Sequence, residues 1–225
     1  MAIIKKNILG TFQGALSGII LRERNGKLIA YTKPAKQKIS KSKASLNARY
    51  KFAITVALAK EINGNPRLSS IWAQSKIKAT NSYQKLIKVN TAFTEPYSLT
   101  VKNKITPDGI PLKNIAIQLN NNFLEITLDF SKIDRQLLRS DKLFCLVHFW
   151  STNINSAKQS GKPDFVLQLF SFDLSGLDKN TTKQFLIDLK NLKKPEFNNG
   201  LALVSLAGVS DNKIFWSSTF GHKFI

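Results

Sequence analysis

From residue 115 onwards, apolar and polar residues alternate with a period of two, and this pattern constrains the fold more than any other feature. The alternation is clearest over residues 115–119 and 123–130, on either side of Asn120-Asn121-Asn122. Successive side chains of a strand lie on opposite faces, so alternation is typical of a sheet with one buried face. Five further short apolar runs follow, separated by turn residues, at 143–150, 165–174, 185–189, 201–209 and 214–220. Seven short strands without long helices between them predict an antiparallel β-sandwich of immunoglobulin-like type.

The first half of the chain has a different pattern. Arg24-Asn25-Gly26-Lys27 separates the apolar runs 19–21 and 28–31, and an Asn-Gly pair between two such runs predicts a hairpin. Glycines at positions 10, 14 and 18 leave a second interpretation open, a close-packed helix face. Apolar residues at helical spacing predict helices at 43–62, from Pro66 onwards and at about 81–90, with Ser42 and Asn65 as N-caps. The expected fold class is therefore α+β, with a hairpin and two or three short helices before the sandwich.

The stretch 95–112 contains the turn formers Pro96, Pro107, Gly109 and Pro111. Proline fixes φ, and Asp-Gly pairs favour tight turns. This composition indicates a boundary between a first domain, residues 1–104, and a second domain, residues 105–225.

Charge is distributed unevenly between these two parts. The chain has 34 Lys and Arg against 14 Asp and Glu, a formal net charge of +20. Residues 1–104 hold 20 of these bases and only three acids, Glu23, Glu61 and Glu95, so almost all of the excess lies there. A positive excess of this size favours association with nucleic acid or another anionic surface.

The acid-free segment 33–43 is the strongest candidate for the anion-binding region. Its lysines, together with Arg49 and Lys51 on the helix expected to follow, form the predicted phosphate-binding set: Lys33, Lys36, Lys38, Lys41, Lys43, Arg49 and Lys51. Each lysine that displaces a counterion from a phosphate adds salt-dependent affinity. A solvated linker is the alternative interpretation of the segment. Tyr50, Trp72 and Tyr83 suit base stacking, although aromatics at helical spacing are more typical of a core.

No catalytic motif is apparent. Residues 156–163 lack the first glycine and the final Ser or Thr of a phosphate-binding loop, and no Gly-x-Ser-x-Gly frames a nucleophile, although a Ser-His-Asp triad needs no local motif. Cys145 and His148 are three residues apart on an expected strand, so they point to opposite faces and cannot share a metal ion. We expect Cys145 to be buried and His148 to face outward or to be hydrogen-bonded. The sequence therefore predicts no enzyme activity, no metal site and no cofactor.

The first 60 residues resemble an uncharacterised family of small basic bacterial proteins. The resemblance rests on Ile8-Leu9-Gly10, Phe12, Gly14, Gly18, Lys33-Pro34 and the helix segment Asn47-Ala48-Arg49-Tyr50-Lys51-Phe52. Thr11 replaces the second glycine of the usual pair, and Arg24-Asn25-Gly26-Lys27 replaces an aromatic-glycine segment. The resemblance implies a β-sandwich-like C-terminal part and no catalytic residues, and it supplies no function.

The expected location is the cytoplasm. One cysteine excludes an intramolecular disulfide. The apolar stretch 8–21 is interrupted by Thr11, Gln13 and Ser17 and lacks a cleavage site, and no run reaches the length of a membrane span. Taken together, the sequence predicts a non-enzymatic protein that binds DNA or RNA. The alternative is a structural or assembly protein, such as a phage- or secretion-associated component, that uses the sandwich to bind a protein partner or another copy. Attachment to an anionic membrane surface is a weaker third hypothesis.

Overall fold

The structure is a computed structural model, and it divides the chain into two compact units, Met1–Lys41 and Ser42–Ile225. It describes residues 2–4, 14–16, 18–24, 27–32, 40–113, 115–120, 123–153, 155, 158–159, 164–176, 182–190, 199–211 and 213–224.

The first unit contains a four-stranded antiparallel sheet. Its strands are β1 (Ala2–Ile4), β2 (Gly14–Leu16), β3 (Ile19–Arg24) and β4 (Lys27–Thr32), in the order β1-β4-β3-β2. The predicted hairpin is confirmed, because Arg24 pairs with Lys27 and Ile19 with Thr32. Gly18 has a φ of +85° in the turn between β2 and β3, a conformation that glycine adopts without strain. Gly14 and Gly18 therefore serve a sheet and its turn, and a glycine-lined helix face is wrong for these two positions.

The second unit contains two antiparallel sheets. The larger has the order β11-β10-β7-β8, and β12 also pairs with β10. Its members are β7 (Lys142–Thr152), β8 (Phe165–Asp173), β10 (Asn199–Ser210), β11 (Lys213–Trp216) and β12 (Phe220–Phe224). The smaller sheet, β5-β6-β9, consists of β5 (Ile115–Asn120), β6 (Phe123–Asp129) and β9 (Thr182–Asp188). The turns η1 (Phe130–Lys132) and α4 (Arg135–Leu138) lie between β6 and β7.

The two sheets share an apolar core. Alternate residues of β6 and β7 are buried in it, including Ile126, Leu128, Cys145 and Val147. This burial follows from the alternation in the sequence, which gives each strand one apolar face. The α+β class with antiparallel sheets is thus confirmed, while the immunoglobulin-like topology remains a prediction.

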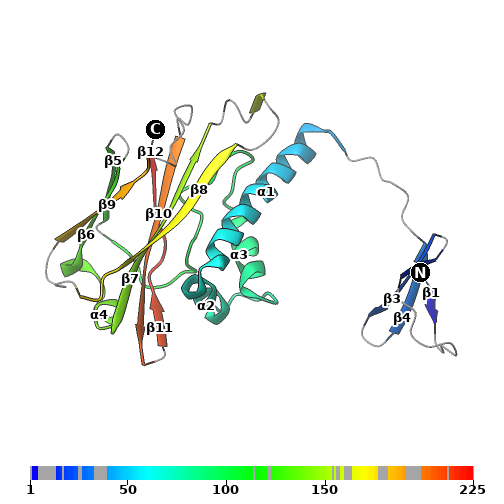
Figure 1. The fold of residues 1–225 in the computed structure, drawn as a ribbon, viewed down its shortest axis with the longest axis horizontal. Coiled ribbons are helices and arrows are strands. Elements are labelled where there is room, and N and C mark those ends of the chain that lie inside the picture. Colours follow the sequence, from blue (N-terminus) through cyan, green and yellow to red (C-terminus); the bar gives the residue numbers. More distant parts are fainter. Residues whose placement is uncertain are drawn as a thin grey trace. The chain divides into compact units, whose positions relative to one another are not determined.

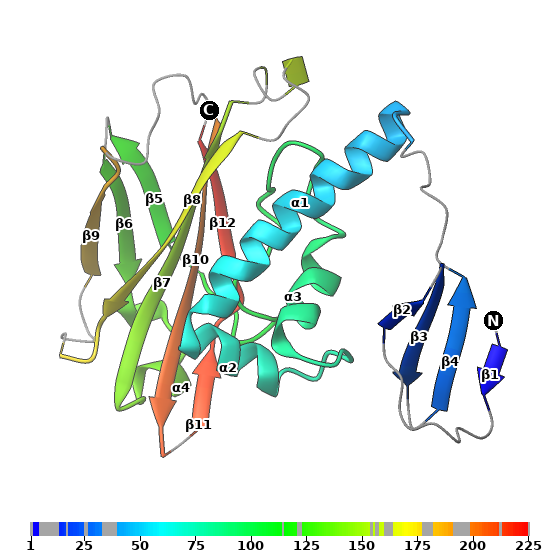
Figure 2. The same ribbon diagram turned by 45° about the vertical axis from the view of Figure 1, so that its right-hand side comes forward.

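Three helices cover the other face of the larger sheet (Figures 1 and 2). They are α1 (Lys43–Gly64), α2 (Pro66–Gln74) and α3 (Ser82–Asn90). The expected caps are present: Ser42 accepts a hydrogen bond from Ser45 N, and Asn65 accepts from Arg67 N and Leu68 N. A second apolar cluster joins the helices to the sheet; it includes Ile54, Leu58, Ile62, Leu68, Trp72 and Leu86 from the helices and Leu146, Trp150, Leu201 and Leu203 from β7 and β10.

This helical layer changes the domain division. Residues 42–104 belong to the same compact unit as the two sheets, so the chain divides at 41–42 and not near 104. The physical reason is that the apolar stripes of the helices are buried on a sheet whose strands occur much later in the sequence. β7 is consequently buried on both faces, with Cys145 towards one core and Leu146 towards the other.

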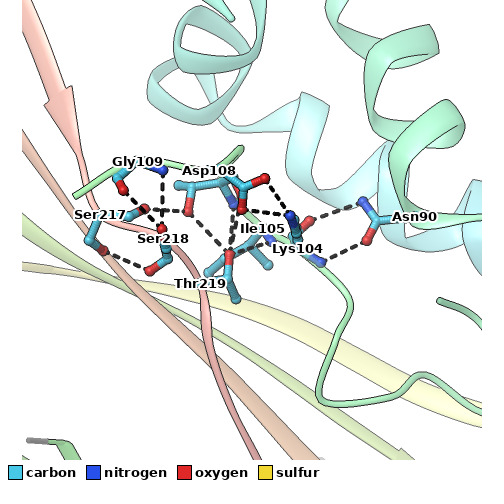
Figure 3. A network of polar contacts seen from close by, with 9 residues as sticks. Asn90, Lys104, Ile105, Asp108, Gly109, Ser217, Ser218 and Thr219 are labelled. Atoms are coloured by element: carbon cyan, nitrogen blue, oxygen red, sulfur yellow. Dashed lines mark hydrogen bonds and ion pairs between the residues drawn. The ribbon is translucent and has the colours of Figure 1, made fainter. Parts of the chain in front are cut away.

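The proline-rich connection after α3 is bonded to both layers (Figure 3). Thr219 Oγ1, between β11 and β12, accepts hydrogen bonds from Ile105 N at 3.0 Å and Thr106 N at 3.1 Å. On the helical side, Trp72 Nε1 donates to Ile105 O at 2.8 Å, and Asn90 Oδ1 accepts from Lys104 N at 2.7 Å. The turn chemistry that suggested a domain boundary therefore belongs to a strap inside one unit. Among the described residues, no helix combines the length and the apolar character that crossing a bilayer requires.

Candidate nucleic-acid interface

The N-terminal half of α1 projects beyond the core. Residues 43–53 are all exposed or half-buried, and the first buried residue of the helix is Ile54. Figure 2 shows this half of α1 extending past α2 and α3. The 22 residues of α1 span about 33 Å at 1.5 Å per residue, so roughly half of the helix length is free of the apolar cluster.

The projecting half carries positive charge only. Lys43 and Arg49 are exposed and Lys51 is half-buried, and no acidic residue precedes Glu61 on the helix. The first turn contains no acid, so no carboxylate of that turn offsets the positive partial charge of the helix N-terminus. Arg49 Nη2 donates to Ser45 Oγ at 2.9 Å, which holds the guanidinium along the helix. The arrangement attracts anions to this end of α1.

The structure places three residues of the predicted phosphate-binding set, Lys43, Arg49 and Lys51, within the first turns of α1. Lys41 is the residue before the capping Ser42 in the chain and ends the first unit. Arg49 and Lys51 are separated by about 200° around the helix axis at 100° per residue. Arg49 and Lys51 thus lie on nearly opposite sides of the helix. The predictions for Lys33, Lys36 and Lys38 concern positions outside the described residues.

A groove that the sequence did not reveal lies beside this half-helix. It has a volume of about 790 Å³ and lies between α1 and the connection after α3; its lining comprises Asn47, Ala48, Lys51, Ala92, Phe93, Thr94, Glu95, Pro96, Thr100, Val101 and Lys102. Two lysines, Lys51 and Lys102, and one acidic residue, Glu95, therefore lie in an otherwise largely apolar surface. The two segments are about 50 residues apart in sequence, so no local motif could have identified the groove.

Aromatic residues are divided between the core and the surface. Trp72 is fully buried and hydrogen-bonded to Ile105 O, so its interpretation as core is confirmed. The Tyr50 ring packs at 5.5 Å from that of Tyr97, and Tyr83 packs against the helical core. Phe52, at the end of the helix segment that carries the family resemblance, is 53% exposed on the projecting half of α1.

Cys145 and His148 provide no reactive centre. Cys145 is fully buried, and burial raises the pKa of its thiol to about 12, so the prediction of an inert buried cysteine is confirmed. His148 is also fully buried, and neither ring nitrogen has a hydrogen-bond partner among the described residues. The expectation that it faces outward or is hydrogen-bonded is wrong, because the helical layer covers the face of β7 that would otherwise be exposed. In the described ranges, no group of three or more His, Cys, Asp or Glu side chains is placed to hold a metal ion.

Comparisons with known proteins place no further constraint on this interface. No protein-family model, curated protein or solved structure matches the chain.

Proposed function

We propose that the protein is a non-enzymatic nucleic-acid-binding protein whose phosphate contacts come from the projecting half of α1 and the acid-free, lysine-rich segment 33–43 that leads into it. The observation that carries the proposal is the placement of Lys43, Arg49 and Lys51 on eleven helical residues, none of them buried or acidic. The residues of this half-helix are exposed or half-buried, so its three cationic side chains lie at or near the surface.

The remaining charge of the helical layer supports the same proposal. Residues 42–104 hold eleven bases and two acids, Glu61 and Glu95. Glu61 Oε1 accepts a hydrogen bond from Leu169 N on β8, so one of the two acids is used to cover a sheet edge. Lysine contacts to phosphate give affinity without sequence preference. This function fits a cytoplasmic location.

Removing the charge of the half-helix tests the proposal. We expect the triple variant Lys43→Gln, Arg49→Gln, Lys51→Gln to bind a short DNA at least tenfold more weakly at about 0.1 M salt. The magnitude of the slope of log K against log salt should fall by about 2–3, because each phosphate contact contributes about 0.7–0.9 to it. Fluorescence anisotropy over a salt series gives both quantities.

The matched control removes equal charge elsewhere. Arg135, Arg139 and Lys213 are exposed at α4 and the β10–β11 turn, and the triple variant to Gln at these positions should keep most of the affinity. Equal losses in the two triple variants, or an affinity that does not change with salt, would contradict the proposal.

A second candidate function is assembly through the outer face of the β5-β6-β9 sheet. Leu186 is 61% exposed there and Phe123 is 39% exposed, and exposed apolar surface on a sheet face can contribute to a protein contact. Leu186 lies opposite Glu125 in the register, and Lys190 Nζ lies 5.8 Å from the Phe123 ring. We propose the immunoglobulin-like arrangement for the two facing sheets, which leaves this face for a protein partner or a second copy.

Light scattering tests this second function. We expect an oligomer at about 0.5 M salt, where charge contacts are largely screened, and we expect Leu186→Lys to shift it to monomer. Gln136→Lys adds the same charge at an exposed position of α4, outside the β5-β6-β9 sheet, and should leave the oligomer intact. A wild-type protein that is monomeric at every concentration counts against this function.

A further inference from the structure

We propose that the groove between α1 and residues 92–102 accepts an unpaired base, so that the preferred ligand is single-stranded nucleic acid. This inference rests on the proposed function and specifies its ligand class. The groove lies directly beside the cationic side chains of the projecting half-helix, because Lys51 belongs both to the groove lining and to that half of α1.

The wall of the groove suits the face of a base. Ala48, Phe93, Pro96 and Val101 supply apolar and aromatic surface, and Val101 is 44% exposed. Bases stack on aromatic side chains whatever their identity, because every base has a π-face. A base in a duplex is already stacked and paired, so it cannot enter a groove of this kind without first leaving the helix.

Charge at the groove favours a ligand with phosphates. Lys51 and Lys102 line it from opposite segments, and Glu95 is the acid among its lining residues. Lys104 Nζ lies 5.8 Å from the centre of the Phe93 ring and 2.6 Å from Asp108 Oδ1. Lys104 is thus ion-paired, and a base against Phe93 would have Lys51 and Lys102 of the groove lining for the adjoining phosphates.

The polar groups of the groove indicate tolerance of base identity. Thr94 Oγ1 donates to Asn90 O, and Thr100 Oγ1 donates to Phe93 O. Asn47 Oδ1 accepts from Tyr97 Oη at 3.5 Å. Since these groups already have protein partners, stacking contributes more than hydrogen bonds to base edges.

The groove is also held rigidly. The backbone of Val101 lies against β12, where a Cβ added to Gly221 would approach Val101 O to 2.5 Å and Val101 Cα to 2.8 Å. Asn103 Nδ2 donates to Asn90 Oδ1 and Thr94 Oγ1, at 3.1 Å and 3.0 Å. Because these contacts hold the groove in shape without a ligand, less conformational entropy is lost when a ligand binds.

The test compares single and double strands on the full chain. The probe is a fluorescein-labelled oligothymidylate of about 12 nucleotides, and its duplex with oligoadenylate is the comparison. We expect the single strand to bind at least tenfold more tightly at equal salt. Phe93→Leu, which keeps the apolar volume but removes the ring, should weaken single-strand binding roughly five- to twentyfold, the lower range of one lost base stack. Duplex binding and the salt slope should not change.

Two further variants keep the test decisive. Phe52→Leu removes an exposed ring that is outside the groove lining and should bind the single strand as the wild type does. Val101→Glu places a carboxylate on an exposed part of the groove and should abolish the preference for single strands even if Phe93→Leu is unstable. Thermal unfolding confirms that each variant is folded.

The outcomes separate the two proposals. The single-stranded and duplex probes could bind equally and in a salt-dependent way, with no effect of Phe93→Leu or Val101→Glu. That result would overturn the groove assignment and leave the proposed function standing. A loss with Phe52→Leu and none with Phe93→Leu would also overturn it. If neither the single-stranded nor the duplex probe binds at low salt, the proposed function is overturned and this inference with it.

Discussion

Replacing Thr219 by valine should lower the free energy of unfolding by about 2–4 kcal/mol, although the side-chain shape is kept. Thr219 Oγ1 is the acceptor for two successive backbone N–H groups, those of Ile105 and Thr106. Valine leaves both donors unsatisfied, and an unsatisfied buried donor costs about 1–3 kcal/mol. Urea denaturation at neutral pH measures the loss.

A serine at the same position is the matched control. Thr219→Ser keeps the hydroxyl and removes one methyl group, so the expected loss is only about 1 kcal/mol. Equal losses for valine and serine would show that packing of the methyl group matters and that the two hydrogen bonds do not.

The effect of Thr219 extends to both layers, because the strap it holds also contacts the helices. Ile105 N donates to Thr219, and Ile105 O accepts from Trp72 Nε1 in the centre of the helical core. A single residue of the strap therefore links the sheet to α2. Residues 217–219 interrupt the last strand of the sheet, and this interruption makes room for the strap (Figure 3).

Local structure was predictable where it depends on neighbouring residues. Ser42, Asn65 and Asn81 begin the three long helices, because each side chain accepts a backbone N–H two or three positions later. The Asn-Gly hairpin and the alternation at β5 and β6 follow from equally short patterns. These signals need no knowledge of the rest of the chain.

Arrangements between distant segments were not predictable in the same way. The apolar stripe of α1 indicates that one face is buried, but not that β7 and β10 bury it. For this reason the domain boundary, the burial of His148 and the groove beside Lys51 were missed. The apolar run 143–147 in β7 was a signal in the sequence, since an uninterrupted apolar strand is typical of a sheet covered on both faces.

His148 should make the protein lose stability as the pH falls from about 6.5 to about 4. Burial lowers the pKa of its imidazole from 6.5 to about 4, because the charged ring loses its hydration in the core. The unfolded chain therefore takes up a proton in this window and the folded chain does not. Stability is fully present above pH 6.5, and the difference in pKa corresponds to a loss on the order of 3 kcal/mol by pH 4.

The variant His148→Leu isolates this contribution. Leucine has a similar volume and needs no hydrogen bond, so stability at pH 7.5 should equal or exceed that of the wild type. The difference between the two proteins should then grow as the pH is lowered towards 4. Asp129 and Asp173, whose hydrogen bonds with Ser131 and Ser175 lower the pKa of their carboxyls, are present in both proteins and cancel from this difference.

Urea denaturation at several pH values between about 7.5 and 4 measures the effect, with His222→Gln as the second histidine variant. His222 lies on β12 and is half-buried, so this variant shows whether the acid loss is specific to the fully buried His148. A wild-type stability that stays constant across this range, or an acid loss that survives in His148→Leu, would mean that the imidazole is hydrated or paired in solution. Because His148 lies between the sheet and α1–α3, the acid-induced loss should begin with release of the helical layer. Faster hydrogen exchange in α1–α3 than in β5 and β6 at pH 5 would show this order.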